Sequence, residues 1–125
     1  MKLHEDTLDD LNVITGYGDD HVLINGEAMA GNVIVLPRST RTGWAPNGFD
    51  GLTSDDIAPL AALETDIVII GTGSRQRFPS PAILRPLIDA RIGMEIMDVA
   101  AACRTYNILV GENRNVAVAL MFDAT

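Results

Sequence analysis

The sequence predicts an α/β fold in a single domain. Between residues 67 and 122, short apolar segments of strand length alternate with longer helical segments in the order β-α-β-α-β. The first third of the chain instead consists of short segments separated by turn residues, which is typical of an antiparallel β-meander. A length of 125 residues and a hydrophobic content of 47% fit one domain with a core of its own.

The chain begins with an acidic, polar segment, residues 1–11, which we expect to be a flexible arm ahead of a domain at residues 12–125. Apolar and polar residues then alternate, as in a half-exposed strand. Asn25-Gly26 is a strong hairpin signal, because both central residues of a type I′ turn take positive φ. The predicted strands of the meander are residues 12–17, 21–24, 27–30 and 33–36.

Residues 38–52 contain several glycines and a proline without any periodic pattern, so they predict a long loop. The only tryptophan, Trp44, lies in this loop. Long loops often carry function, which makes Trp44 a candidate contact residue. The alternative is that Trp44 covers the hydrophobic core.

The remaining elements follow from local signals. Thr53 and the two aspartates at 55–56 are typical of a helix start. The β-branched run 67–70 indicates a strand buried on both faces. Asp98 is a good N-cap for the helix that follows it. The expected order is a helix at 81–91, a strand at 94–97, a helix at 99–110 and a last strand at 116–122, whose direction the pattern leaves open.

The most distinctive stretch, Gly71-Thr72-Gly73-Ser74-Arg75-Gln76, follows the strand at 67–70 directly. In an open α/β sheet, ligands bind at the carboxyl ends of the strands, so this stretch and Asp98 should converge there. The segment is neither a dinucleotide fingerprint, because position 76 is Gln, nor a Walker loop, because no lysine follows. The alternative is a tight turn in which Arg75 pairs with an acid such as Asp98.

The glycines would let a ligand approach the backbone closely, and Thr72 and Ser74 offer hydroxyl groups. The guanidinium of Arg75 suits a carboxylate or phosphate. Two polar residues of the helix at 99–110 share one face and extend the candidate surface. The candidate ligand or partner contacts are Gly71, Thr72, Gly73, Ser74, Arg75, Gln76, Asp98, Arg104, Asn107 and Trp44.

The sequence offers few side chains that are suited to catalysis. Ser74 has no histidine or lysine near it in the sequence that could act as its base. Both histidines, His4 and His21, lie far from the candidate edge, and the single cysteine, Cys103, is expected on the buried face of its helix. We therefore expect no catalytic residue, no cofactor and no metal site.

The net charge of −8 is unevenly distributed. Residues 1–66 hold twelve acids and three bases, whereas residues 67–125 hold five acids and six bases. This acidity argues against nucleic acid as a partner, while the arginines near the candidate edge leave room for a local anion or an acidic partner. No apolar run is long enough to span a membrane, so we expect a cytoplasmic protein without membrane insertion.

The run IIGTGSRQRFPSPAIL, followed by IGMEIMDVAAACRTYNIL, resembles a small α/β domain family of unknown biochemical function. This family includes the mitochondrial complex I (NADH:ubiquinone oxidoreductase) assembly factor three and the adipogenesis-associated domain proteins. The resemblance extends from about Val13 to Met121 and depends on Gly71-Thr72-Gly73, Asp98 and Thr105-Tyr106-Asn107. It implies a three-layer α/β fold with a mixed central sheet and an added meander. The acidic start resembles that of a bacterial member.

The resemblance implies protein-assembly work and supplies no catalytic residues. Our preferred hypothesis is a non-catalytic interaction or assembly module that contacts a protein partner through the edge at Gly71–Gln76. The alternative is a protein or enzyme that handles a small anionic ligand at the same edge. A homodimer is a third hypothesis.

Overall fold

The computed structural model describes residues 10–123, and a mixed five-stranded sheet in the order β5-β4-β8-β6-β7 forms its centre. Strand β6 runs parallel to both β7 and β8, whereas β4 runs antiparallel to β5 and β8. The strands of this sheet are β4 (Val33–Leu36), β5 (Ser39–Thr42), β6 (Ile67–Thr72), β7 (Gly93–Met97) and β8 (Val116–Met121).

A second, antiparallel sheet has the order β1-β2-β3. Its strands are β1 (Ile14–Tyr17), β2 (His21–Ile24) and β3 (Glu27–Ala30). The turn between β2 and β3 has positive φ at both Asn25 and Gly26, as the sequence predicts. The helices are α2 (Ser54–Ala61), α3 (Pro81–Asp89) and α4 (Val99–Gly111). None of the described helices is long and apolar enough to cross a membrane.

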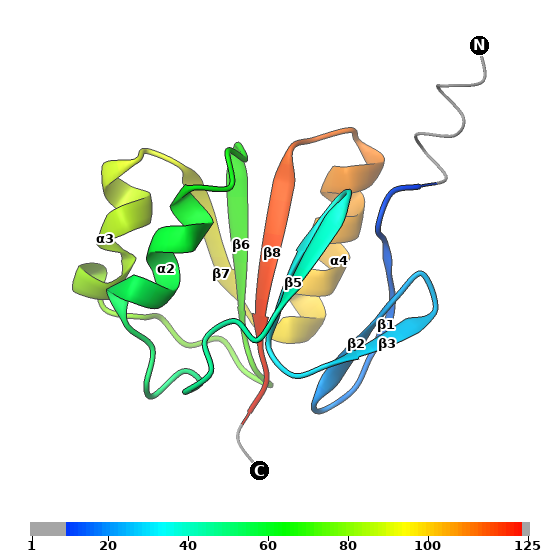
Figure 1. Cartoon of the computed structure of the whole chain (residues 1–125), viewed down its shortest axis with the longest axis horizontal. Coiled ribbons are helices and arrows are strands. Elements are labelled where there is room, and N and C mark those ends of the chain that lie inside the picture. The colour runs from blue at the N-terminus through cyan, green and yellow to red at the C-terminus, as the bar shows by residue number, and fades with distance from the viewer. Residues whose placement is uncertain (1–9, 124–125) are drawn as a thin grey trace.

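Three layers result from this arrangement. Figure 1 shows α2 and α3 on one face of the central sheet, and α4 with the small sheet on the other. Alternation along β8 supplies both cores, because Val118 and Leu120 join the cluster that contains α4 while Ala117 and Met121 join the cluster that contains α2 and α3. The predicted three-layer α/β fold with a mixed sheet is therefore confirmed.

Two predictions about the first third are corrected. The meander has three strands, because β4 pairs with β8 in the central sheet and not with β3. Its run Val33-Ile34-Val35 is buried on both faces, which suits a central strand better than a meander with one solvated face. Residues 39–42, predicted as loop, form β5 in a hairpin with β4; they are mostly polar and exposed, so they carry no apolar alternation.

The helix starts match the expected caps. Asp98 accepts a hydrogen bond from the backbone N–H of Ala101 at 2.8 Å. At the start of α2, the carboxylate of Asp56 accepts hydrogen bonds from the backbone N–H and the hydroxyl of Thr53, at 3.0 and 3.2 Å. Strand β8, whose direction the pattern left open, returns parallel to β6. These features place the carboxyl ends of β6, β7 and β8 at one edge.

The small sheet is attached to α4 by two side chains of the Thr105-Tyr106-Asn107 segment. The hydroxyl of Tyr106 donates to the carbonyl of Asn12 at 2.9 Å. The amide of Asn107 accepts from the N–H of Ile14 at 2.9 Å and donates to its carbonyl at 2.8 Å, as a neighbouring strand would. Residues 1–9 of the predicted arm and residues 124–125 lie outside the described residues, and Leu11 packs against the core.

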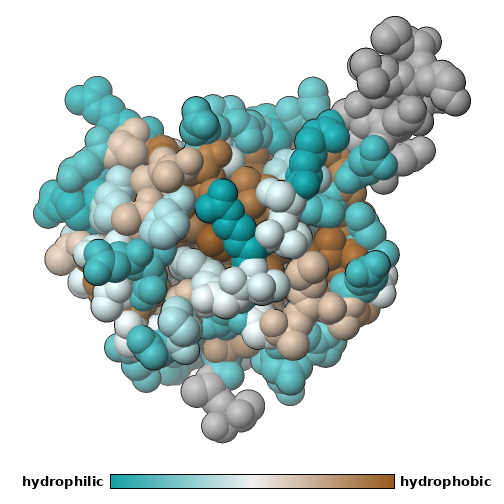
Figure 2. Space-filling model, viewed as in Figure 1, coloured by the Kyte–Doolittle hydropathy of each residue, from teal (hydrophilic) through white to brown (hydrophobic). Residues whose placement is uncertain are grey.

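The front of the molecule is mixed in polarity. Figure 2 shows hydrophobic residues reaching the surface between α2 and the β4–β5 hairpin, with hydrophilic residues around them. Tyr17 and Phe78 are among the larger apolar side chains with substantial exposure, at 48% and 68%. Tyr17 ends β1, and Phe78 lies in the connection between β6 and α3.

Candidate functional site

The carboxyl edge of the central sheet brings together the loop after β6 and the start of α4. We call residues 73–77 the site loop. The N–H of Val99 donates to the carbonyl of Gly73 at 2.8 Å, and the amide of Gln76 donates to the carbonyl of Ile96 at 2.7 Å. The predicted convergence of the loop with Asp98 is thus confirmed. Strand β6 is two residues longer than predicted and includes Gly71 and Thr72.

Gly71 lets β6 approach α4 closely. A Cβ atom at this position would lie 2.8 Å from the side chain of Leu120 and 3.2 Å from the Cβ of Ala102. Both neighbours are fully buried, so they have little room to move. Gly71 therefore contributes to the position of the edge through packing, and its backbone is buried beneath α4.

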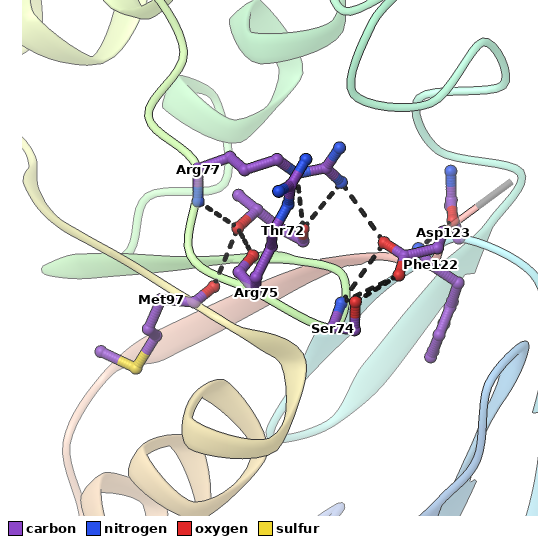
Figure 3. Close-up of polar contacts among 8 residues, drawn as sticks. Thr72, Ser74, Arg75, Arg77, Met97, Phe122 and Asp123 are labelled. Atoms are coloured by element: carbon purple, nitrogen blue, oxygen red, sulfur yellow. Dashed lines mark hydrogen bonds and ion pairs between the residues drawn. The ribbon is translucent and has the colours of Figure 1, made fainter.

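Thr72 is fully buried and organises the site loop from inside. Its hydroxyl donates to the carbonyl of Arg75 at 2.8 Å and accepts from the N–H of Arg77 at 2.9 Å. Its own carbonyl accepts from Nε and Nη2 of Arg77 at 3.2 and 2.8 Å. Figure 3 shows these contacts converging on Thr72. The loop is thereby held in one conformation at the end of β6.

Arg77 links the site loop to the long connection before α2. Its guanidinium lies 4.4 Å from the ring centre of Phe49, in a cation–π arrangement. It also lies 3.4 Å from a carboxylate oxygen of Asp123. The predicted alternative paired Arg75 with Asp98; the ion pair in the structure joins Arg77 and Asp123 instead.

Asp123, which follows β8, accepts hydrogen bonds from Ser74 and Arg77 of the site loop. Its carboxylate accepts from the hydroxyl of Ser74 at 2.5 Å and from the N–H of Ser74 at 3.3 Å. The Ser74 hydroxyl is the main cause that lowers the pKa of Asp123, and the nearby arginines act in the same direction. Gly73 has a φ of +91°, and a Cβ there would overlap this carboxylate. Asp123 is therefore ionised at neutral pH.

Arg75 and Gln76 differ in how they are engaged. Gln76 is held by the carbonyl of Ile96, whereas the exposed guanidinium of Arg75 makes no hydrogen bond or ion pair to any residue within 10–123. Arg75 thus projects from a loop whose backbone Thr72 fixes. A guanidinium in this situation can bind a carboxylate or phosphate without losing an existing contact.

The other predicted site residues are distributed elsewhere. Trp44 is buried in the core beneath α2, where its indole N–H donates to the carbonyl of Asp56 at 2.8 Å. Asn107 uses its amide to hold Ile14, on the small-sheet side of α4. Arg104 is exposed on α4, five residues after the helix begins at Val99. These three residues do not join the site loop.

Cys103 lies in the core as expected. It is buried against the sheet, and burial raises the pKa of its thiol to about 12. The thiol therefore remains protonated and unreactive at neutral pH. Within residues 10–123, no cluster of histidine, cysteine and acidic side chains is suited to a metal ion.

Sequence reasoning missed Asp123, Arg77, Phe122 and Asn32. Asn32 holds the end of β8, because its side-chain oxygen accepts from the N–H of Phe122 at 2.8 Å and its amide donates to the carbonyl of Ala45 at 2.8 Å. One signal could have found Asp123. It follows the last predicted strand as Asp98 follows the strand before it, and a parallel last strand would place both at one edge.

The chain matches the model of a family described as "Protein of unknown function (DUF498/DUF598)" over residues 14–121. It is 34% identical over 116 residues to the Drosophila melanogaster protein "NADH dehydrogenase [ubiquinone] 1 alpha subcomplex assembly factor 3". This alignment covers 87% of the chain but only 58% of the Drosophila protein.

Solved structures of bacterial proteins share the fold. A Bordetella parapertussis protein is similar with a TM-score of 0.81 and 35% identity, over 90% of this chain and 97% of that one. A Bordetella pertussis protein described as a Mth938-like domain has a TM-score of 0.70 and 30% identity, over 94% of this chain and 88% of that one. The likeness therefore spans nearly the whole described fold.

Proposed function

Because the chain belongs to the DUF498/DUF598 family, whose curated relatives include proteins named as complex I assembly factors, we propose that it is a non-catalytic assembly module. It binds a protein partner through the site loop and the neighbouring start of α4. The chain covers 58% of the length of the Drosophila relative, so the module corresponds to part of that protein. The partner of this chain belongs to the proposal and is not taken from the relative's name.

The observation that best supports the proposal is that the two arginines of the site loop differ in their contacts. Thr72 and Arg77 are bonded inside the protein, while Arg75 projects into solvent from the loop they fix. A charged group on a rigid support loses little conformational entropy when it meets a partner. Arginine is also enriched among the residues that dominate protein interfaces.

The contacts of Ser74 favour binding over catalysis. A serine nucleophile needs a base that can take its proton near neutral pH. The group hydrogen-bonded to Ser74 is Asp123, and that same bond lowers the pKa of the carboxylate. A carboxylate with a lowered pKa is a weak base, so Ser74 is poorly activated.

A small anionic ligand, the alternative from the sequence, would meet competition at this edge. The hydroxyl and N–H of Ser74 already bond to Asp123, which also faces Arg77. A free anion would have to displace this carboxylate or bind to Arg75 alone. Thermal stabilisation by phosphate- or carboxylate-bearing metabolites would support this alternative over the assembly module.

The proposal is tested by pull-down from native lysate with the wild type, Arg75→Ala and Arg114→Ala. Arg114 is also an exposed arginine, but it lies in the turn before β8, at the opposite edge of the sheet. Loss of a charge-assisted contact predicts that Arg75→Ala retains about tenfold less of a specific partner, while Arg114→Ala retains it fully. An unchanged partner list for Arg75→Ala would overturn the proposal.

Both variants should fold, because each side chain is exposed. Circular dichroism and the thermal midpoint check this. The molar mass of the wild type across a concentration series identifies the other outcome, a second copy of the chain as the partner. In that case Arg75→Ala should shift the protein toward the monomer.

A further inference from the structure

A cavity of about 520 Å³ opens next to the site loop. It lies between the β1–β2 turn, the start of α4 and the residues that follow β8. Its volume falls within the range of about 300–1,000 Å³ that is usual for binding pockets. The side chains that define its character are Tyr17, Asp19, Ser74, Asp98, Phe122 and Asp123.

The charge of the cavity is negative. Asp19, Asp98 and Asp123 line it from three separate segments of the chain, and no lysine, arginine or histidine is among its lining residues. Arg77 pairs with Asp123 from outside this set and Arg75 also acts on that carboxylate electrostatically, whereas Asp19 has no ion-pair partner among residues 10–123. A positively charged group would therefore find carboxylates on more than one wall.

The N–H donors around the cavity are largely occupied, which disfavours an anion. At the start of α4, the N–H groups of Val99 and Ala101 bond to Gly73 and Asp98, at 2.8 Å each. The N–H of Ser74 bonds to Asp123. These contacts use most of the groups through which a helix start or a glycine loop would otherwise bind phosphate or carboxylate.

Two aromatic side chains complete the walls. Tyr17 is 48% exposed at the end of β1, and Phe122 is half-buried. Aromatic faces attract cations, and they also pack against the aliphatic part of a lysine or arginine side chain. The same protein already uses this chemistry where Arg77 stacks on Phe49 at 4.4 Å.

We infer that this cavity receives a basic side chain, arginine or lysine, from the protein partner. The inference rests on the proposed function and specifies the chemistry of the partner at that site. The charged end of the basic side chain meets Asp19, Asp98 and Asp123, while its aliphatic part passes between Tyr17 and Phe122. The acidity of the chain as a whole, with a net charge of −8, favours the approach of such a partner.

The test uses capped tripeptides as probes: acetyl-Gly-Arg-Gly-amide, acetyl-Gly-Lys-Gly-amide and, as the acidic control, acetyl-Gly-Glu-Gly-amide. Each is titrated into the ¹⁵N-labelled full chain, and amide shifts are followed by NMR. The basic peptides should give saturable shifts at Gly18, Ser74 and Ala100, with millimolar affinity. The acidic peptide should give none at these positions. Saturable shifts from the acidic peptide alone would overturn the inference.

Variants of the chain test whether the basic peptides bind in this cavity. Asp19→Asn should weaken the binding of the arginine peptide about fivefold, and Tyr17→Ala about threefold. Asp89→Asn, an equal charge change on α3 away from the cavity, should leave it unchanged. Equal weakening by Asp89→Asn and Asp19→Asn would mean that only overall charge attracts the peptide, and it would overturn the inference.

Asp19→Lys in the lysate pull-down separates this inference from the proposed function. If Asp19→Lys and Arg75→Ala both lose the same partner, a basic anchor at the cavity is supported. If Asp19→Lys keeps a partner that Arg75→Ala loses, the inference fails and the proposed function stands. If neither variant loses a partner, the proposed function fails as well.

Discussion

Strand β6 has a buried threonine near each end, and their hydroxyls have different surroundings. At the carboxyl end, the hydroxyl of Thr72 makes hydrogen bonds to Arg75 and Arg77. At the amino end, the hydroxyl of Thr65 is buried without a hydrogen-bond partner among the described residues. The carboxyl end is thus organised by a buried side chain that bonds to the backbone of the site loop, and the Thr65 hydroxyl has no such role at the amino end.

Two main-chain contacts and one side-chain contact close the amino edge, where the amide of Asn115 donates to the carbonyl of Glu64 at 2.9 Å. The N–H of Asp66 donates to the carbonyl of Asn115 at 2.9 Å, and the N–H of Gly93 donates to the carbonyl of Asp66 at 3.3 Å. The carboxyl edge has the charged pair Arg77–Asp123, the exposed Arg75 and an adjoining cavity. Under the proposed function, these groups of the carboxyl edge are the ones that meet a partner.

The largest effect is expected from Gly71→Val, which disrupts the carboxyl edge. The added side chain would meet Leu120 and Ala102 inside a packed core, so the free energy of unfolding should fall by about 3 kcal/mol. Urea denaturation measures this change. Gly111→Ala, where a Cβ meets nothing within 4 Å, is the control and should change the free energy by less than about 1 kcal/mol. Equal losses would refute the packing role of Gly71.

The two threonines give the next test. Thr72→Val should lower the free energy of unfolding by about 2 kcal/mol, because it leaves the N–H of Arg77 and the carbonyl of Arg75 without their partner. Thr65→Val should leave the free energy of unfolding unchanged or raise it by about 1 kcal/mol. It removes a buried hydroxyl that has no hydrogen-bond partner among residues 10–123. Similar losses from both substitutions would remove the contrast between the two ends.

A smaller effect concerns Asp123. Its pKa in the folded protein lies below the ordinary value of 3.8, chiefly because the Ser74 hydroxyl bonds to the carboxylate. A lowered pKa means that the ionised form stabilises the fold above pH 3.8, and that this contribution is lost as the pH falls through the folded-state pKa. The stability difference between wild type and Asp123→Asn should therefore be present at pH 7 and vanish in acid.

Denaturation at several pH values checks this expectation. Ser74→Ala should move the NMR-measured pKa of Asp123 back toward its ordinary value. A difference between wild type and Asp123→Asn that grows as the pH falls would contradict the assignment.

Much of the fold could be predicted because its signals are local. The β-branched run of β6, the Asp98 cap and the Asn25-Gly26 turn each act within a few residues. The place of β4 could not, since its pairing with β8 joins Val35 to Val118 across most of the chain. Strand β5 was missed because its residues are polar and form an exposed edge.

The candidate site, too, could be predicted only where its signals are local. The site loop and Asp98 could be placed at one edge from the order of the strands. The roles within the loop could not, because Ser74 and Arg77 meet Asp123 across 49 and 46 residues of sequence. Arg75 and Arg77 look equivalent in the sequence, and only the packing of Phe49 and the carbonyl of Thr72 distinguishes them.

The central claim, that the partner meets the carboxyl edge, is tested most directly by site-specific photo-crosslinking in native lysate. A photoreactive residue replaces Gln76 at the carboxyl edge or Asn113 at the amino edge, both of which are exposed. If the partner meets the carboxyl edge, a discrete crosslinked protein is expected from position 76 and none from position 113. Crosslinking from position 113 alone, or to the same partner equally from both positions, would contradict it.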